Sequence, residues 1–90
     1  MADGDGQDGG KISPLCAVVE VVVKTLVDHP EAVKVTESIR RGMTIVELST
    51  APGDMGKIIG RQGRTAAALR TLVALTAERH GVRAQLDIRD

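Results

Sequence analysis

The residues best suited to chemistry lie in one stretch, GDMGKIIGRQGR, which spans residues 53–64. Gly60 and Gly63 are separated by two residues. Three basic side chains stand before, within and after this pair: Lys57, Arg61 and Arg64. Glycine has no Cβ, so it allows a sharp turn and lets a polyanion approach the backbone. Glycine disfavours helices, yet this pair lies between two segments with helical spacing. Glycines combined with basic side chains favour contact with phosphate groups.

Two common phosphate-binding motifs do not match this stretch. A Walker loop places a glycine five residues before its Gly-Lys pair and a Ser or Thr directly after it. Ala51 and Ile58 occupy these positions around Gly56-Lys57. A dinucleotide-binding fingerprint needs two glycines separated by a single residue, and residues 53–64 contain no such pair. The sequence therefore supports neither class of nucleotide-dependent enzyme.

The remaining reactive side chains form no catalytic or metal-binding pattern. The single cysteine, Cys16, lies in an apolar run, which predicts a buried thiol. His29 and His80 fall at the expected ends of helices, where an imidazole commonly meets free carbonyl groups. No Ser/His, Cys/His or paired-carboxylate constellation is recognisable. We therefore expect a protein that is not an enzyme and that uses no cofactor.

The amino-terminal part of the folded chain predicts a helix. Ser13 and Pro14 provide an N-cap and a first helical residue. Apolar residues recur at spacings of three and four along one face: Leu15, Val18, Val19, Val22, Leu26 and Val27. The sequence Asp28-His29-Pro30 ends the helix, because the residue before a proline disfavours helical geometry.

Three segments alternate between apolar and polar residues, as half-buried strands do. The first two, residues 33–39 and 43–49, are joined by the turn Arg40-Arg41-Gly42 and predict an antiparallel hairpin. The third lies at the carboxyl end, where the apolar side consists of Val82, Ala84, Leu86 and Ile88, and the polar side of Arg83, Gln85, Asp87 and Arg89. Each of these strands can therefore direct one side towards a core.

Two helices should flank the glycine pair. Asp54 is placed to help start a short helix over Met55–Ile59, and a second helix runs from Arg64 to about His80. The inner face of the second helix is expected to hold Leu69, Leu72, Val73 and Thr76. The element order is therefore αββααβ. This order predicts an α+β fold in which a three-stranded sheet is covered on one face by three helices.

A helix, a Gly-x-x-Gly loop and a second helix together suit a nucleic-acid clamp. The free N–H groups and the positive dipole end of the second helix face the loop. Arg61 and Gln62 project from the loop, and Lys57 and Arg64 lie on its flanks. A sugar-phosphate backbone fits this environment, and an adjacent apolar surface can receive unstacked bases. Because the chain has no Phe, Tyr or Trp, stacking on aromatic side chains is excluded.

Charge is unevenly distributed along the chain, although the formal net charge is zero. Residues 1–10 carry three aspartates and no basic residue, so the remaining residues have a net charge of +3. Residues 55–83 carry six basic residues and one acidic residue, and this basic region includes the glycine loop. We expect residues 1–12 to form a disordered acidic tail and residues 13–90 to form the folded domain. With no visible signal peptide or membrane-spanning stretch, the expected location is the cytoplasm.

The segment Ile59–Arg64, with the sequence IGRQGR, resembles the signature of the KH domain, whose Gly-x-x-Gly loop clamps about four nucleotides of single strand. The order αββααβ is similar to the type II, bacterial form of that fold. From Leu15 to Asp90 the chain more closely resembles the small bacterial single-KH RNA-binding proteins of the KhpA family. The resemblance rests on the helix that ends in Asp-His-Pro, the GDMGKIIGRQGR block and the RTLV segment at residues 70–73. The acidic residues 1–12 depart from the family pattern.

The resemblance implies roles for individual residues. Six of them would bind RNA: Lys57, Gly60, Arg61, Gln62, Gly63 and Arg64. The four residues from Gly60 to Gly63 would form the clamp, and the two flanking basic residues would contact phosphates. The floor of an adjoining groove would come from Ile58 or Ile59 and from Leu48. Arg70 and Arg79, further along the second helix, are assigned to a solvated face.

We therefore predict an RNA-binding protein that clamps the backbone of short single-stranded RNA segments, as a post-transcriptional regulator or an RNA chaperone. One clamp should bind weakly and with salt-dependent affinity, and a second linked site would raise the apparent affinity. The resemblance also implies a homodimer, or a heterodimer with a larger KH-containing RNA-binding protein. Two alternatives remain open: a protein-interaction module that keeps the KH fold, and a protein that binds single-stranded DNA.

Overall fold

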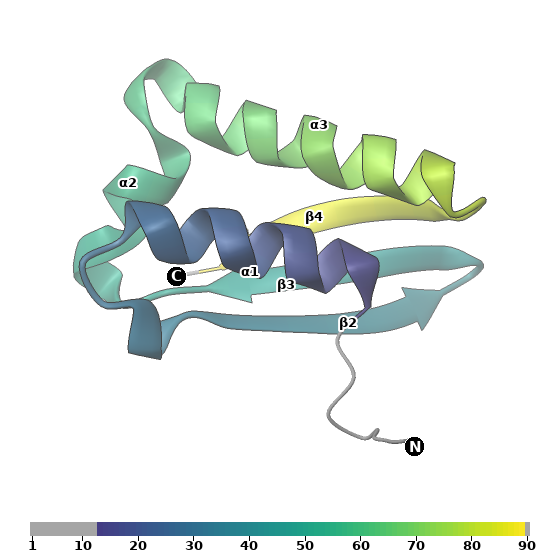
Figure 1. Ribbon diagram of the computed structural model, residues 1–90, viewed down its shortest axis with the longest axis horizontal. Helices are drawn as coiled ribbons and strands as arrows, with labels where there is room; N and C mark the ends of the chain where they lie inside the picture. Colours follow the sequence, from purple (N-terminus) through teal and green to yellow (C-terminus); the bar gives the residue numbers. More distant parts are fainter. Residues whose placement is uncertain (1–12, 90) are drawn as a thin grey trace.

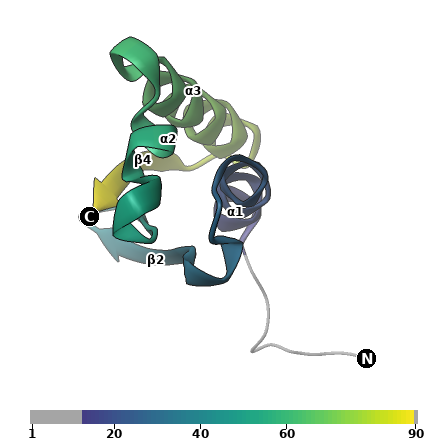
Figure 2. The ribbon, with the colours of Figure 1, turned by 90° about the vertical axis from the view of Figure 1, so that its left-hand side faces the viewer.

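The elements follow the order expected from the sequence. A computed structural model describes residues 13–89, which form α1 (Pro14–Leu26), β2 (Lys34–Arg40), β3 (Met43–Ser49), α2 (Met55–Ile59), α3 (Arg64–Arg79) and β4 (Arg83–Arg89). Single turns of 3-10 helix lie at Pro30–Ala32, Pro52–Asp54 and Arg61–Gly63. The three α-helices cover one face of the sheet (Figure 1, Figure 2). The predicted acidic tail, residues 1–12, lies outside the described residues.

The sheet is mixed, with its strands in the order β2-β3-β4. β2 and β3 are antiparallel and are joined by the two-residue turn Arg41-Gly42, so the predicted hairpin is confirmed. β4 runs parallel to β3, with Val46 beside Leu86 and Leu48 beside Ile88. A parallel neighbour requires a long crossover, which α2 and α3 provide. The glycine loop is therefore the middle of this crossover.

The core lies between the helices and the covered face of the sheet. Val46 and Leu48 of β3 belong to the same buried cluster as Val19 and Val23 of α1 and Ile58 of α2. All five side chains have a relative exposure of 0%. Burial of such apolar surface is the main force that stabilises a domain without aromatic residues. It fixes the short helix α2, and so the start of the loop, against the sheet.

The start of α1 agrees with the sequence. Ser13 caps the helix, because its hydroxyl oxygen accepts a hydrogen bond from the backbone N–H of Cys16 at 3.2 Å. Cys16 is buried, as predicted. Burial, with a further contribution from the neighbouring Glu37 carboxylate, raises the pKa of this thiol. A protonated, buried thiol is a small apolar side chain and a poor nucleophile.

Two buried helix faces differ from the expected ones by a small rotation. On α1, Leu26 is exposed, and Val23 is buried instead. On α3, Leu72 is 37% exposed, whereas Leu69 and Val73 are only 1% exposed. Spacings of three and four residues fit several adjacent stripes of a helix, and the packing partners select one of them. The predictions that Leu26 and Leu72 would be buried were therefore wrong.

The second face of the sheet, which we call the open face, is polar. Alternation along β4 directs Arg83, Gln85, Asp87 and Arg89 to this face, as predicted, while Leu86 and Ile88 pack with the core. At one end of the open face, the Arg89 guanidinium donates to Glu47 Oε2 on β3 at 2.9 Å. A solvated ion pair of this kind contributes little to stability.

Candidate nucleic-acid interface

The glycine loop reverses the chain between α2 and α3 through an unusual run of backbone angles. Gly60, Gln62 and Gly63 all have positive φ, at 76°, 57° and 72°. The N–H of Gly60 donates to the carbonyl of Gly56 at 2.9 Å, and the N–H of Gly63 donates to the carbonyl of Gly60 at 3.1 Å. The loop is therefore one hydrogen-bonded turn, which presents its backbone at the tip of the helical layer (Figure 1).

The two loop glycines are required for different reasons. A Cβ at Gly60 would overlap Thr65 Oγ1 and lie 2.9 Å from the Thr65 nitrogen, so the close approach of α3 excludes a side chain there. At Gly63 nothing lies within 4 Å of a built Cβ, and only the positive φ favours glycine. Gly60 thus holds the loop against α3, whereas Gly63 sets the direction in which α3 begins.

The polar side chains of the loop gather around the start of α3. Arg61, Gln62 and Arg64 are all exposed. Within residues 13–89, no carboxylate oxygen lies within 4.0 Å of Arg61 or Arg64. The first N–H groups of a helix have no partners within the helix, and the dipole makes this end positive. Two guanidinium groups without carboxylate partners in the described residues, together with a helix amino terminus, therefore make this end of α3 electropositive.

Lys57 differs from the loop arginines, because its charge is already compensated. Its ammonium lies 3.2 Å from Asp28 Oδ2 and 3.8 Å from Asp54 Oδ1. Lys57 stands on α2, within one turn of the loop, and its side chain is partly exposed. The structure thus brings five of the six predicted site residues together at the loop, while Lys57 lies beside them in an ion-pair network.

Asp54 joins the start of α2 to the turn that follows α1. Its side chain is 1% exposed, and its oxygens accept hydrogen bonds from the backbone N–H groups of Asp28 at 3.1 Å and His29 at 2.9 Å. The His29 ring nitrogen Nδ1 lies 3.3 Å from the same carboxylate. Burial acts to raise the pKa of Asp54, but these hydrogen bonds outweigh it and hold the pKa below its usual value.

Asp54 occupies the N-cap position of α2, as expected, but its side chain does not help to start that helix. Its side chain makes no capping hydrogen bond to α2. It instead caps the backbone after α1, at a site that lies 25 to 26 residues away in the sequence. The turn after α1 and the start of α2 are consequently fastened to each other, which restrains the helix that leads into the glycine loop.

The predicted groove floor also needs correction. Leu48 and Ile58 are completely buried in the core, so neither can line an open groove, whereas Ile59 at the end of α2 is exposed. Two hollows lie instead between α3 and β4. One, of about 440 Å³, is lined by Arg70 and the end of β4, residues 87–89. A second, of about 390 Å³, is lined by Arg70 and β4 residues 84–87.

Arg70 is therefore a candidate interface residue that sequence reasoning missed. It was assigned to a solvated face, but it borders both hollows between α3 and β4. No periodic signal within α3 distinguishes it, because the hollows exist only where α3 meets the edge of the sheet. Gln85 and Asp87 lie on the facing strand, where Gln85 Nε2 donates to Asp87 Oδ1 at 3.1 Å. These groups supply hydrogen-bond donors and acceptors along the groove.

Two other kinds of feature are absent from the part of the chain that the structure describes. No group of three or more His, Cys, Asp or Glu side chains in residues 13–89 is arranged to hold a metal ion. None of the described helices is long and apolar enough to cross a membrane. The features described above, namely the glycine loop, the start of α3 and the groove between α3 and β4, form the candidate interface.

The fold and the loop together define the class of the protein. A mixed three-stranded sheet in the order αββααβ, with a Gly-x-x-Gly loop between the second and third helices, is a type II KH domain. The model of the family described as "KhpA/KhpB, KH domain" matches residues 17–88. The chain therefore belongs to the KhpA/KhpB KH-domain family.

Similar proteins share most of their length with this chain. The RNA-binding protein KhpA of Halalkalibacterium halodurans is 48% identical over 73 residues, which cover 81% of this chain and 96% of the relative. The RNA-binding protein KhpA of Clostridium perfringens is 44% identical over 79% of this chain and 95% of its own length. The protein of the same name from Aquifex aeolicus is 40% identical, with 86% and 98% covered. The family resemblance noted in the sequence is thus confirmed.

Proposed function

We propose that this protein binds single-stranded RNA and clamps its backbone with the loop from Gly60 to Gly63. The observation that carries the proposal is the loop geometry. The loop leads directly into the positive end of α3, its residues Arg61 and Gln62 are exposed, and Arg61 and Arg64 have no carboxylate partners among residues 13–89. The relatives named RNA-binding protein KhpA support RNA as the ligand.

The phosphates and the bases have separate binding surfaces in this proposal. Phosphates meet the side chains of Arg61, Gln62 and Arg64 at the positive end of α3. Lys57 is a further phosphate contact, and a bound phosphate would draw its ammonium away from the exposed Asp28 carboxylate. The bases turn past Ile59 into the groove between α3 and β4. There Arg70 and the polar side chains of β4 make hydrogen bonds to base edges, because the chain has no Phe, Tyr or Trp for stacking.

Such a clamp suits a protein that binds many RNAs with modest sequence preference. Backbone contacts carry no sequence information, and one clamp covers about four nucleotides. The affinity of a single domain is therefore low and falls with salt. These properties fit a cytoplasmic post-transcriptional regulator or RNA chaperone.

Two copies held together would bind RNA more tightly than one. On α3, Leu72 and Leu75 are exposed, and Leu75 is 57% exposed. Exposed leucines on one helix provide an apolar contact for a second copy, or for a larger KH-containing RNA-binding protein. Two linked clamps raise the apparent affinity through effective concentration. The same leucines would serve a protein-interaction module, which is the second candidate function.

A titration by fluorescence anisotropy tests the proposal. A labelled, unstructured RNA of about eight nucleotides, long enough for one clamp of about four, should bind with an affinity that weakens as salt rises. A DNA oligomer of matched sequence should bind less tightly. Equal binding of both would favour single-stranded DNA as an alternative ligand. No binding of either at low salt would contradict the proposal and favour the protein-interaction role.

A further inference from the structure

Three arginines meet at the hairpin end of the open face, far from the glycine loop in the sequence. Arg40 on β2 pairs with Met43 on β3, and Met43 lies beside Arg83 on β4. Strand alternation directs the side chains of Arg40, Met43 and Arg83 to the open face. Because adjacent strands lie about 5 Å apart, the Cα atoms of Arg40 and Arg83 are about 10 Å apart. Arg41 follows Arg40 directly in the hairpin turn.

These arginines are not neutralised by the fold. Within residues 13–89, no carboxylate lies within 4.0 Å of any of the three. At the opposite end of the open face, Arg89 is paired with Glu47 at 2.9 Å. Residues paired across the three strands form rows on the open face. The two rows nearest the hairpin turn contain no acidic residue; they are Arg40, Met43 and Arg83, and then Ser38, Ile45 and Gln85. One end of the open face is therefore basic, and the other is mixed.

The backbone of the hairpin turn is a second, independent observation. Arg41 has φ of 54° and Gly42 has φ of 78°. A two-residue turn with positive φ at both positions normally takes Asn, Asp or Gly first. A long side chain is strained there, and strained residues tend to occur at functional sites. Folding alone gives no reason for an arginine at this position.

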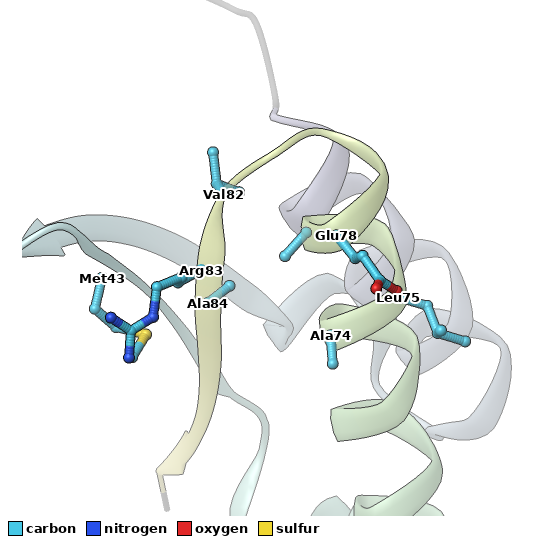
Figure 3. Close-up of a pocket in the computed structure, with 8 residues that line it drawn as sticks. Met43, Ala74, Leu75, Glu78, Val82, Arg83 and Ala84 are labelled. Atoms are coloured by element: carbon cyan, nitrogen blue, oxygen red, sulfur yellow. The ribbon is translucent and has the colours of Figure 1, made fainter.

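A hollow lies at the start of β4, between the end of α3 and this basic end. It has a volume of about 440 Å³, and its walls come from α3, at Ala74, Leu75 and Glu78, and from the start of β4. Its remaining lining includes Met43 and Arg83. Figure 3 shows both of these side chains on the side of β4 that faces away from α3. The hollow is thus bordered both by α3 and by two residues of the open face.

We propose that this basic end, formed by Arg40, Arg41 and Arg83, binds phosphates of the same RNA strand beyond the nucleotides held by the clamp. The inference rests on the proposed RNA-binding function. α3 has 16 residues and is about 24 Å long, so a short RNA held at the glycine loop cannot reach the arginines. A longer strand leaves the groove at the far end of α3 and crosses the start of β4. The ligand is therefore single-stranded RNA longer than one clamp.

The experiment compares two RNA lengths with wild type and with the double variant Arg40→Gln, Arg83→Gln. An RNA of about five nucleotides fills one clamp, and one of about twelve extends beyond it. The variant should bind the longer RNA about tenfold less tightly at 0.1 M salt and bind the shorter one as wild type does. Loss of two phosphate contacts on a single strand should reduce the slope of log affinity against log salt by about 1.4 for the longer RNA.

The control is Lys34→Gln, which removes a charge from the exposed start of β2, at the other end of the sheet. It should leave both affinities unchanged. The proposal is overturned if the double variant keeps the wild-type affinity and salt slope for the longer RNA. It is also overturned if both RNAs lose affinity equally, because the arginines would then act through the clamp or the fold. If wild type binds neither RNA, the proposed function itself fails, which is a separate outcome.

Discussion

Gly60 is restrained both by its positive φ and by its contact with Thr65. We expect Gly60→Ala to lower the free energy of unfolding by about 2–4 kcal/mol, because a Cβ there is strained and overlaps Thr65. Gly53→Ala, where nothing lies within 4 Å, should change it by less than about 0.5 kcal/mol. Urea denaturation followed by circular dichroism measures both values. Equal stability of the two variants would contradict this explanation of the loop.

Asp54 should make the domain less stable in acid. Its pKa in the folded state lies below the ordinary value of 3.8. The unfolded chain therefore takes up the proton first, and the stabilisation, which is complete above about pH 5, is lost as the pH falls through about 4 towards the folded pKa. Asp54→Asn should destabilise the domain at neutral pH and flatten the decline below about pH 4. Urea midpoints measured across this range test the prediction, and an unchanged acid profile in the variant would refute it.

The glycine loop directly precedes α3, so the packing of α3 determines how firmly the loop is held. Leu69 is 1% exposed and Leu72 is 37% exposed, although both were expected to face the core. Leu69→Ala should cost about 2–5 kcal/mol because it leaves a cavity, and Leu72→Ala less than about 1 kcal/mol. Thermal or urea denaturation of the two variants distinguishes these outcomes. Similar losses would mean that the observed face of α3 is incorrect.

The elements could be predicted because their signals are local. Ser13 and Pro14 mark the start of α1, and the alternation along β4 marks a half-buried strand. The exact buried stripe of a helix, such as Leu69 rather than Leu72, depends on the elements packed against it. The hydrogen bonds of Asp54 and the position of Arg70 beside β4 depend on residues distant in the sequence. Local patterns contain no information about such contacts.

At the scale of the whole molecule, the exposed leucines of α3 bear on self-association. Leu75→Glu should convert a dimer into a monomer, because it places a charge in an apolar contact without disturbing the core. The loss of one of two clamps should also weaken binding of long RNA more than binding of short RNA. Light scattering coupled to size-exclusion chromatography measures the mass. A wild-type protein that is monomeric at high concentration, alone and with a KH-containing partner, would contradict the proposed pairing.

The glycine loop itself was predictable from the sequence, because its glycines and basic residues are contiguous. Its position at the tip of the crossover, with α3 leading away from it, follows from the order of the elements. The groove beside it was not predictable, because Leu48 and Ile58, which were expected to line it, are needed for the core. These apolar side chains therefore stabilise the core, while Arg70 and residues of β4 line the hollows.

The measurement that tests the central claim most directly is RNA binding by the double variant Arg61→Asp, Gln62→Asp. Aspartate tolerates the positive φ of Gln62, so the loop backbone can be kept. The variant Lys34→Asp, Thr36→Asp makes the same change in net charge at exposed positions of β2. Circular dichroism should show that both variants are folded.

In anisotropy titrations with an unstructured RNA, the loop variant should lose at least about tenfold in affinity, because it places carboxylates where phosphates bind. The β2 variant should bind nearly as wild type does. If the folded loop variant binds as tightly as wild type, the loop is only a turn between two helices, and the clamp account is wrong.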